Sequence, residues 1–251
     1  MAVPQIWEEE FRVLTFHMDP MSKIHLTSIC NFLQEGASMH AEEAGFGFLE
    51  MSKRNQVWVL TRLKVVIDKY PGWKSKLKLK TWSRGRQGIF YIRDFMIENN
   101  VGLPIISASS SWAALNLKSR RPELVDRLED GLHTLADKIA LAEPLHKLPD
   151  LISPKVLRSR TIEYTDIDIV FHVNNVKYVE LIMNSYSKQQ HLKYIPVELE
   201  INYLGEALYG DEVIIRVDQH QHKAGADLIS IVRSSDQREV CRALVSWAER
   251  K

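Results

Sequence analysis

The sequence predicts an α+β protein of two tandem units, each a long helix wrapped by an antiparallel sheet. Two observations lead to this fold class. Each half of the chain follows the same order of one strand, one helix and then a run of strands. Within the strands, apolar and polar residues alternate, as Val213, Ile215 and Val217 do with Arg216 and Asp218. Such alternation buries one sheet face, against which a helix with an apolar stripe can pack.

In the first half, residues 11–17 are expected to form a strand, and Asp19-Pro20 marks a turn. Apolar residues at helical spacing predict a long helix from about Ser22 to Ala44, ended by Gly45. Turn signals such as Pro71-Gly72 then separate four runs that are typical of strands. These predicted strands are Val57–Asp68, Leu77–Trp82, Phe90–Glu98 and Ile105–Asn116.

The second half repeats this order. A strand is expected at Arg160–Tyr164 and a helix at Asn174–Gln190. The strands that follow are predicted at Val197–Leu204, Val213–Gln219, Leu228–Ser234 and Val240–Glu249. Aromatic residues recur in the two halves at a nearly constant separation. The number of residues from Trp73 to Tyr209 is nearly the same as that from Trp112 to Trp247. A repeat of about half the chain indicates a tandem duplication, and not a solenoid.

The segment between the halves, residues 117–155, is predicted to be a linker. Glu123–Ala142 is charged and has a weak helical period, so one or two surface helices are expected there. Three prolines follow, at Pro144, Pro149 and Pro154. We place the boundary near residue 150, which gives units of residues 1–150 and 151–251.

The composition narrows the class of protein. The 251 residues include 33 Lys plus Arg and 32 Asp plus Glu, a balance that does not favour nucleic-acid binding. The two cysteines, Cys30 and Cys241, are far apart and belong to no C-x-x-C motif, which fits reduced thiols. No apolar run has the length of a membrane span, and no signal peptide is evident. We therefore expect a cytoplasmic protein without a membrane span.

One segment of the second half combines polar side chains with the start of a helix. It contains, in order, Asp166, Asp168, His172, Asn174 and Asn175. Either asparagine is a suitable N-cap for the helix that follows. A helix start offers free backbone N–H groups and a positive dipole end, which suit a developing oxyanion. The plainer interpretation is a capped amphipathic helix whose Asp and His side chains are only solvated.

This segment, D-x-x-x-H-V-N-N-x-K-Y, resembles the signature of the C-terminal half of the acyl-acyl carrier protein thioesterases of plants and many bacteria. Further segments are similar to the N-terminal half of that family: Trp58–Arg62, Asp68–Pro71, Thr81-Trp82, Ser111-Trp112 and Arg120–Pro122. The resemblance spans nearly the whole chain. It implies that each unit has the hot-dog fold, with the catalytic residues in the second unit and the acyl-chain pocket in the first.

The resemblance also implies a reaction: hydrolysis of the thioester of fatty acyl-acyl carrier protein, which releases free fatty acid. It implies no cofactor, and acyl carrier protein as the partner that carries the substrate. In the family, a D-x-N-x-H triad works with a glutamate on a bend, often followed by a cysteine. Asp168, His172 and Glu206 match these positions, whereas Val170 and Ala207 stand where the family has Asn and Cys.

Candidate general bases from the residues themselves are Asp166, Asp168, His172 and Glu206. Glu206 follows Gly205 at a predicted strand end, where a glycine permits a bend that re-aims the next side chain. Because the methyl group of Ala207 cannot attack a thioester, we expect attack by water. The plainer interpretation of Glu206 is an exposed carboxylate at a strand end.

In the expected mechanism, Glu206 activates the water, alone or paired with His172. Asp168 orients His172 or the amides of the helix start. Backbone N–H groups near Val173 and Asn174 hold the oxyanion, and Asn174 or Asn175 replaces the amide that is missing at position 170.

Four lysines, Lys74, Lys76, Lys78 and Lys80, alternate with leucines, so their ammonium groups are predicted to project from one strand face. The plainer interpretation is a solvated edge strand that resists aggregation. The functional interpretation is a docking surface for an acidic carrier protein.

Two other functions stay open. An acyl-CoA thioesterase would share the fold, and Val170 is compatible with a protein that binds acyl chains without cleaving them. A homodimer also stays open. His220 and His222 share a predicted strand face, but no carboxylate or cysteine joins them at ligand spacing, so no metal site is predicted.

Overall fold

The computed structural model describes residues 3–126, 128–219 and 225–250. The chain divides into two compact units, Met1–Leu145 and His146–Lys251, close to the boundary placed near residue 150. The predicted α+β class is confirmed, because each unit combines helices with an antiparallel sheet. The described helices include none that is long and apolar enough to cross a membrane.

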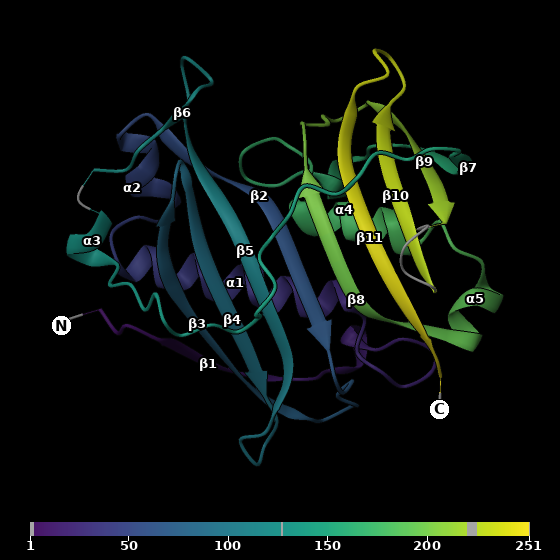
Figure 1. The fold of residues 1–251 in the computed structure, drawn as a ribbon, viewed down its shortest axis with the longest axis horizontal. Helices are drawn as coiled ribbons and strands as arrows, with labels where there is room; N and C mark the ends of the chain where they lie inside the picture. The colour runs from purple at the N-terminus through teal and green to yellow at the C-terminus, as the bar shows by residue number, and fades with distance from the viewer. Residues whose placement is uncertain (1–2, 127, 220–224, 251) are drawn as a thin grey trace. The chain divides into compact units, whose positions relative to one another are not determined.

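In the first unit the strands are antiparallel neighbours in the order β1-β3-β4-β5-β2. Helix α1 runs along one face of this sheet (Figure 1). The elements are β1 Trp7–Arg12, η1 Thr15–His17, α1 Leu26–Glu43, α2 Phe48–Lys53, β2 Gln56–Ile67, β3 Lys76–Gln87, β4 Phe90–Glu98 and β5 Pro104–Asn116.

The second unit repeats the first element for element, which confirms the predicted duplication. Its strand order, β7-β9-β10-β11-β8, matches that of the first unit. The elements are β7 Lys155–Thr161, η2 Tyr164–Asp166, α4 Asn175–Met183, α5 Lys188–Lys193, β8 Tyr194–Tyr203, β9 Glu212–Gln219, β10 Ala226–Arg233 and β11 Glu239–Glu249.

Each long helix buries its apolar stripe against its own sheet. In α1, Ile29, Leu33 and Ala37 are buried. Gly36 allows the helix to approach β3 closely, because a Cβ at this position would overlap the side chain of Leu79. In α4, Val176, Tyr178, Val179, Leu181 and Ile182 form the equivalent buried stripe. These contacts fix where the N-terminal ends of both helices lie over their sheets.

The first strand and the second helix differ from their predicted bounds. The strand expected at residues 11–17 is β1 at Trp7–Arg12, and Thr15–His17 form the short helix η1. The helix expected at Asn174–Gln190 ends at Met183, and α5 begins at Lys188. The break has a tertiary cause, because the Tyr186 hydroxyl donates to Asp227 at 3.0 Å and Trp247 Nε1 donates to the same carboxylate at 3.1 Å.

The predicted linker is mostly extended, and the expectation of surface helices over Glu123–Ala142 is largely wrong. This stretch holds only one four-residue helix, α3 at Leu128–Gly131, among its described residues, and β6 at Pro122–Glu123 pairs with β5. Hydrogen bonds between its backbone and side chains of the sheet tie this stretch to the first unit. Trp82 Nε1 donates to the Lys138 carbonyl at 2.8 Å, and the Ala140 N–H donates to Asp94 at 2.8 Å.

Candidate active site

The polar turn predicted before the second helix and the bend predicted at Gly205 meet in the second unit. The Val173 N–H donates to the Ala207 carbonyl at 3.2 Å, which joins the segment before α4 to the segment after β8. The residues that precede this pair in sequence are His172 and Glu206. Their side chains approach each other, with 3.7 Å between His172 Nδ1 and Glu206 Oε1.

The His172–Glu206 pair is open to solvent. The His172 side chain is 30% exposed and that of Glu206 is 39% exposed, so water reaches both groups. A separation of 3.7 Å is longer than a hydrogen bond. Contacts between catalytic groups are often loose in a free enzyme and tighten when substrate binds. The pair can therefore hold and deprotonate a water molecule without a large movement of the chain.

The bend that carries Glu206 is held by its backbone. The Leu204 and Gly205 N–H groups both donate to the Val240 carbonyl, at 2.9 and 3.1 Å, which turns the chain out of the β8 ladder. The Glu206 carbonyl accepts a hydrogen bond from Arg233 Nη1 at 2.9 Å. The next N–H, that of Ala207, donates to the Tyr178 hydroxyl at 3.1 Å.

Sequence reasoning missed Tyr178 and Arg233. Tyr178 belongs to the buried stripe of α4, so its ring gives the signal of a core residue and its hydroxyl gives none. Arg233 is the last residue of β10 and is also paired with Asp236, an arrangement typical of a surface arginine. Only the fold brings both residues to the peptide group that joins Glu206 to Ala207.

Asp168 shapes the turn before His172. Its Oδ1 accepts the Val170 N–H at 3.0 Å, and its own N–H donates to the His172 carbonyl at 2.9 Å. Phe171, between these residues, adopts the left-handed conformation with φ 62°. Hydrogen bonds therefore link Asp168 to the backbone on both sides of Phe171, and this supports a positioning role for Asp168.

Asp166, one of the candidate general bases, has surroundings that give it a structural role. It is 1% exposed, and its carboxylate accepts two hydrogen bonds from Arg160 Nη2, at 3.1 and 2.9 Å. The Glu163 N–H donates to the same carboxylate at 2.9 Å. A buried carboxylate with these partners holds the turn and is not placed to activate water.

The start of α4 agrees with the prediction in part. Asn174 is the N-cap, and its Oδ1 accepts the Val176 N–H at 2.9 Å. The two N–H groups expected to hold an oxyanion are already paired, Val173 with Ala207 and Asn174 with the Asp166 carbonyl at 2.9 Å. They are therefore not available for an oxyanion. Asn175, the first helical residue, is the next candidate, since the first N–H groups of a helix have no partner within the helix.

The structure gives no support to a cysteine nucleophile among the described residues. Ala207 is fully buried and carries only a methyl group. Burial raises the pKa of Cys30 to about 12 and raises that of Cys241 as well. Both thiols therefore stay protonated at neutral pH, and a protonated thiol is a poor nucleophile.

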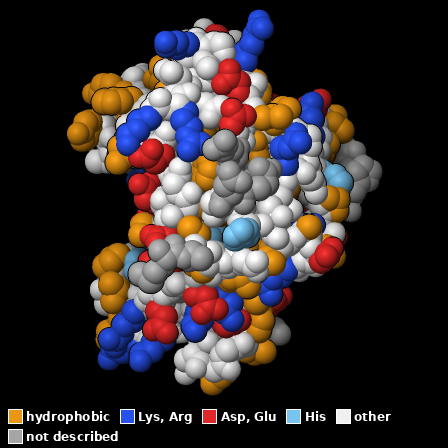
Figure 2. Space-filling view, turned by 90° about the vertical axis from the view of Figure 1, so that its left-hand side faces the viewer, with side chains coloured by type: hydrophobic (Ala, Val, Ile, Leu, Met, Phe, Trp, Pro, Cys, Tyr) orange, Lys and Arg blue, Asp and Glu red, His pale blue; other side chains and the backbone are white. Residues whose placement is uncertain are grey.

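Three of the four lysines share one face of β3 as predicted, because Lys76, Lys78 and Lys80 alternate with the buried Leu77 and Leu79. Lys74 lies in the turn before β3, and β3 is not an edge strand, because it pairs with β1 on one side and β4 on the other. Glu8 of β1 lies 3.4 Å from Lys78 and 3.8 Å from Lys80, and Lys80 is also 2.8 Å from Glu98. Acidic and basic side chains are likewise intermixed on the side of the molecule drawn in Figure 2.

The first unit contains a second copy of the turn that carries Asp168 and His172, with other side chains. Asp19 Oδ1 accepts the Met21 N–H at 2.9 Å, and the Asp19 N–H donates to the Lys23 carbonyl at 2.7 Å, as Asp168 does in its own turn. The Ile24 N–H donates to the Pro71 carbonyl at 3.2 Å, in the way Val173 bonds Ala207. Lys23 and Tyr70 therefore occupy the positions of His172 and Glu206. The duplicated turn has the His–Glu pair only in the second unit.

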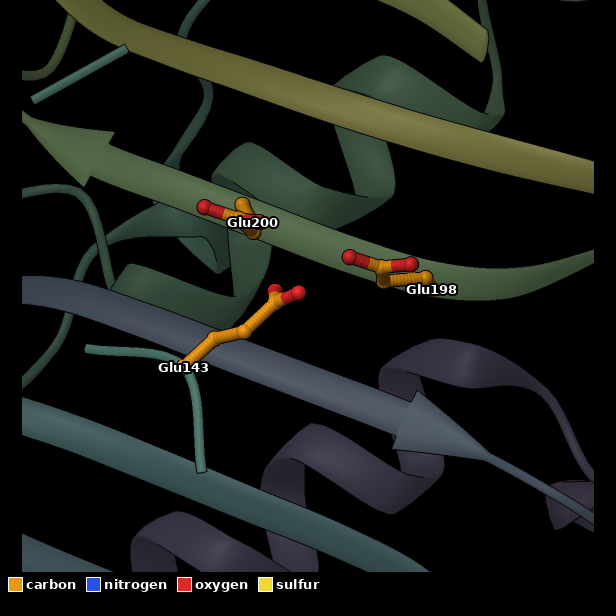
Figure 3. A group of neighbouring side chains, drawn as sticks. All are labelled: Glu143, Glu198 and Glu200. Carbon is orange, nitrogen blue, oxygen red and sulfur yellow. The ribbon is translucent and has the colours of Figure 1, made fainter. Parts of the chain in front are cut away.

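We assign no metal site to the neighbouring carboxylates of Glu143, Glu198 and Glu200. Glu198 and Glu200 project from the same face of β8 (Figure 3). Glu143, drawn in the same figure, belongs to the first unit and pairs with Lys64 at 2.6 Å. Exposed carboxylates are common without an ion. His220 and His222 lie outside the described residues.

Two compact units, each with a helix wrapped by an antiparallel sheet and one with a solvent-exposed His–Glu pair, define a double hot-dog protein. Residues 4–130 match the acyl-ACP thioesterase N-terminal domain, and residues 154–249 match the acyl-ACP thioesterase C-terminal domain. The chain belongs to the acyl-ACP thioesterase family.

Individual relatives agree with this assignment. A chloroplastic palmitoyl-acyl carrier protein thioesterase of Arabidopsis thaliana is 32% identical over 77% of this chain and 51% of its own length. The chain thus spans about half the length of that curated relative. The crystal structure of an acyl-ACP thioesterase from Bacteroides thetaiotaomicron is 26% identical and covers 97% of this chain and 98% of its own, with a TM-score of 0.88. The 12:0-ACP thioesterase from Umbellularia californica shares the fold, with a TM-score of 0.82 at 22% identity over 98% of each chain.

Proposed function

We propose that the protein hydrolyses the thioester of a fatty acyl-acyl carrier protein and releases the free fatty acid. The observation that carries this proposal is the pair of His172 and Glu206, 3.7 Å apart on two segments tied by the Val173–Ala207 hydrogen bond. Family membership supports the reaction class, since the relatives are named as acyl carrier protein thioesterases or hydrolases.

In the proposed reaction, the Glu206 carboxylate takes a proton from water as the water oxygen attacks the thioester carbonyl carbon. The carbonyl electron pair moves onto oxygen and gives a tetrahedral intermediate. When this intermediate collapses, the C–S bond breaks and the sulfur leaves with the proton held by Glu206. The products are a carboxylic acid and a thiol, so the glutamate is regenerated.

The neighbouring groups orient this reaction. His172, next to Glu206, holds the water or the carboxylate in place. Asp168 keeps His172 at the correct point of the turn through its backbone bonds. The oxyanion would be met by the Asn175 N–H at the start of α4 and by the side-chain amides of Asn174 and Asn175. Preorganised donors of this kind stabilise the developing charge more than water does.

The test is hydrolysis by the full chain and by Glu206→Gln, which keeps the size of the side chain but cannot accept the proton. Losing a general base should lower kcat roughly 10²-fold or more. The matched control is Glu180→Gln, because Glu180 belongs to the same unit and is 37% exposed, close to Glu206. A Glu206→Gln variant with native circular dichroism and full activity would refute the water mechanism.

The carrier is tested in the same assay. Acyl chains of one length are presented on acyl carrier protein and on coenzyme A, and kcat/KM is compared. The proposal expects the carrier-linked substrate to be preferred. Turnover of the CoA ester alone would assign the protein as an acyl-CoA thioesterase. Binding of both substrates without turnover would make it an acyl-binding protein. The cytoplasmic location and a homodimer remain predictions.

A further inference from the structure

A cleft of about 490 Å³ opens in the first unit, between the β2–β3 connection, the start of β3 and the β4–β5 turn. This volume lies within the range of small-molecule sites, roughly 300–1,000 Å³. The lining contains three lysines and no acidic residue: Lys69, Tyr70, Pro71, Gly72, Trp73, Lys74, Ser75, Lys76, Leu77, Asn99, Asn100 and Ile105. The cleft is therefore strongly basic, unlike the ion-paired part of β3.

Lys74 has a strained backbone, which the second unit avoids at the same position. Its φ is 62°, in the left-handed region, and its N–H donates to the Val13 carbonyl at 3.0 Å. In the second unit, the Gly210 N–H donates to the Ile162 carbonyl at 3.0 Å, with φ 84°. Glycine adopts this conformation without a steric cost, whereas lysine adopts it only with one. The first unit keeps a lysine at a place where its own duplicate has glycine.

The Lys74 side chain is held beside an exposed indole. Its Nζ lies 4.2 Å from the centre of the Trp73 ring, an arrangement that attracts the ammonium to the ring face. Trp73 itself is 56% exposed, although tryptophan is usually well buried. The turn thus places a cation and an aromatic surface together in the lining of the cleft.

A second unfavourable arrangement lies at the same end of β3. Along the β1–β3 pair, Glu8 lies opposite Lys80 and Glu10 lies opposite Lys78, so the partners have opposite charges. At the cleft end, Arg12 lies opposite Lys76, and both carry positive charge. Like charges directly opposite each other destabilise a strand pair. The positive charge is concentrated where the cleft begins.

We propose that this cleft binds the phosphate group of a phosphorylated ligand. Local strain and like-charge repulsion persist in folded proteins where function requires them, and here both bring ammonium groups to one cavity. Lysine ammonium groups bind phosphate as point charges, and Trp73 offers a surface on which an organic group can stack. Phosphate esters of this kind occur in coenzyme A and in the phosphopantetheine arm of a carrier protein.

The test of this site does not depend on the proposed hydrolysis, because binding can be measured on the full chain without turnover. Isothermal titration at low salt uses three probes: coenzyme A, pantetheine, which lacks phosphate, and pyrophosphate. Coenzyme A and pyrophosphate are expected to bind, more weakly as salt rises, because the charges are exposed. Pantetheine is expected not to bind. Equal affinity for pantetheine and coenzyme A, or no binding of either anion at millimolar concentration, would overturn the proposal.

The decisive variant is Lys74→Gly, which copies the residue of the second unit. It should weaken binding roughly fivefold or more, the effect of one lost charge contact. Its Tm should be unchanged or higher, because the strain is removed. The matched control is Lys78→Gln, because Lys78 lies on β3 just after this turn but outside the lining, and the affinity of this variant should be unchanged. If Lys74→Gly binds as tightly as the native chain, or if Lys78→Gln loses as much affinity, the cleft is not the site.

The source of the phosphate is distinguished with a carrier protein prepared with and without its phosphopantetheine arm. Tighter binding of the form with the arm, lost in Lys74→Gly, would assign the phosphate of the arm. Binding of coenzyme A alone would assign its nucleotide phosphates. Equal binding of both carrier forms would mean that the acidic protein surface, and not a phosphate ester, occupies the cleft, which contradicts the proposal.

Discussion

Replacing Tyr178 by phenylalanine tests how the bend that carries Glu206 is held. The Tyr178 hydroxyl is the acceptor for the Ala207 N–H at 3.1 Å, and Ala207 is fully buried. Tyr178 is only 3% exposed, and burial raises the pKa of its hydroxyl, so the group is neutral throughout the working range. Tyr178→Phe leaves the ring in place and removes only the acceptor.

The magnitude follows from the buried N–H that loses its partner. An unsatisfied buried donor costs about 1–3 kcal/mol of unfolding free energy. For a chain of this size, each kcal/mol lowers Tm by roughly 2–4 °C. Because Ala207 also accepts the Val173 hydrogen bond, loosening it should move Glu206 away from His172. A misplaced base lowers kcat, here by about tenfold, with little change in KM.

The assay combines thermal unfolding, followed by circular dichroism, with steady-state hydrolysis. The control is Tyr164→Phe, since Tyr164 is 83% exposed. Tyr164→Phe should match the native chain in both measurements. The reasoning is refuted if Tyr178→Phe has the native Tm and the native kcat. A loss of Tm with full kcat would mean that the hydrogen bond stabilises the unit but does not position Glu206.

Three further predictions follow. Arg233→Met should lower kcat because the Glu206 carbonyl loses its donor, and Arg233→Lys should restore part of the rate; equal rates in all three proteins would remove Arg233 from the site. Burial, and after it the charge of Arg93, lowers the pKa of His40 to about 4. Between pH 6.5 and pH 4, His40 therefore binds a proton in the unfolded chain but not in the folded chain. Unfolding free energy should therefore fall towards pH 4 by up to about 1.4 kcal/mol per pH unit, and His40→Gln should flatten this slope. Val170→Asn should raise kcat by returning an amide to the catalytic turn, and a lower rate in a folded variant would show that the site has adapted to valine.

The sequence pointed to the two segments of the candidate site because each carries a local signal. The polar turn and the helix start lie within a few residues of Asn174, and Gly205 marks the bend before Glu206. The hydrogen bond between Val173 and Ala207 joins these segments across strand β8 and could not be read from either one. The pairing of the Val173 N–H was missed for the same reason, because its acceptor Ala207 lies after β8, whereas the Asn174 N–H bonds back to Asp166 within the turn itself.

Pairings over long sequence separations explain the other differences. The interpretation of the lysine segment as an edge strand is wrong, because β1 pairs with β3 across about 70 residues, Trp7 with Thr81. Nothing in the sequence near Lys78 indicates this neighbour. Helical spacing continues from Val179 through Met183 to Tyr186, but Asp227 binds the Tyr186 hydroxyl and the helix ends. Periodicity reports which residues could share a face, while tertiary contacts decide where an element stops.

The duplicated turn is a natural substitution experiment. In the first unit, Lys23 and Tyr70 stand where the second unit has His172 and Glu206, yet the backbone hydrogen bonds of the two turns correspond one to one. The loop conformation thus does not depend on which side chains occupy the two positions of the His–Glu pair. Selection can alter the reactive pair of such a protein without endangering its fold. The first unit is also a ready scaffold in which a designer could install a second reactive centre.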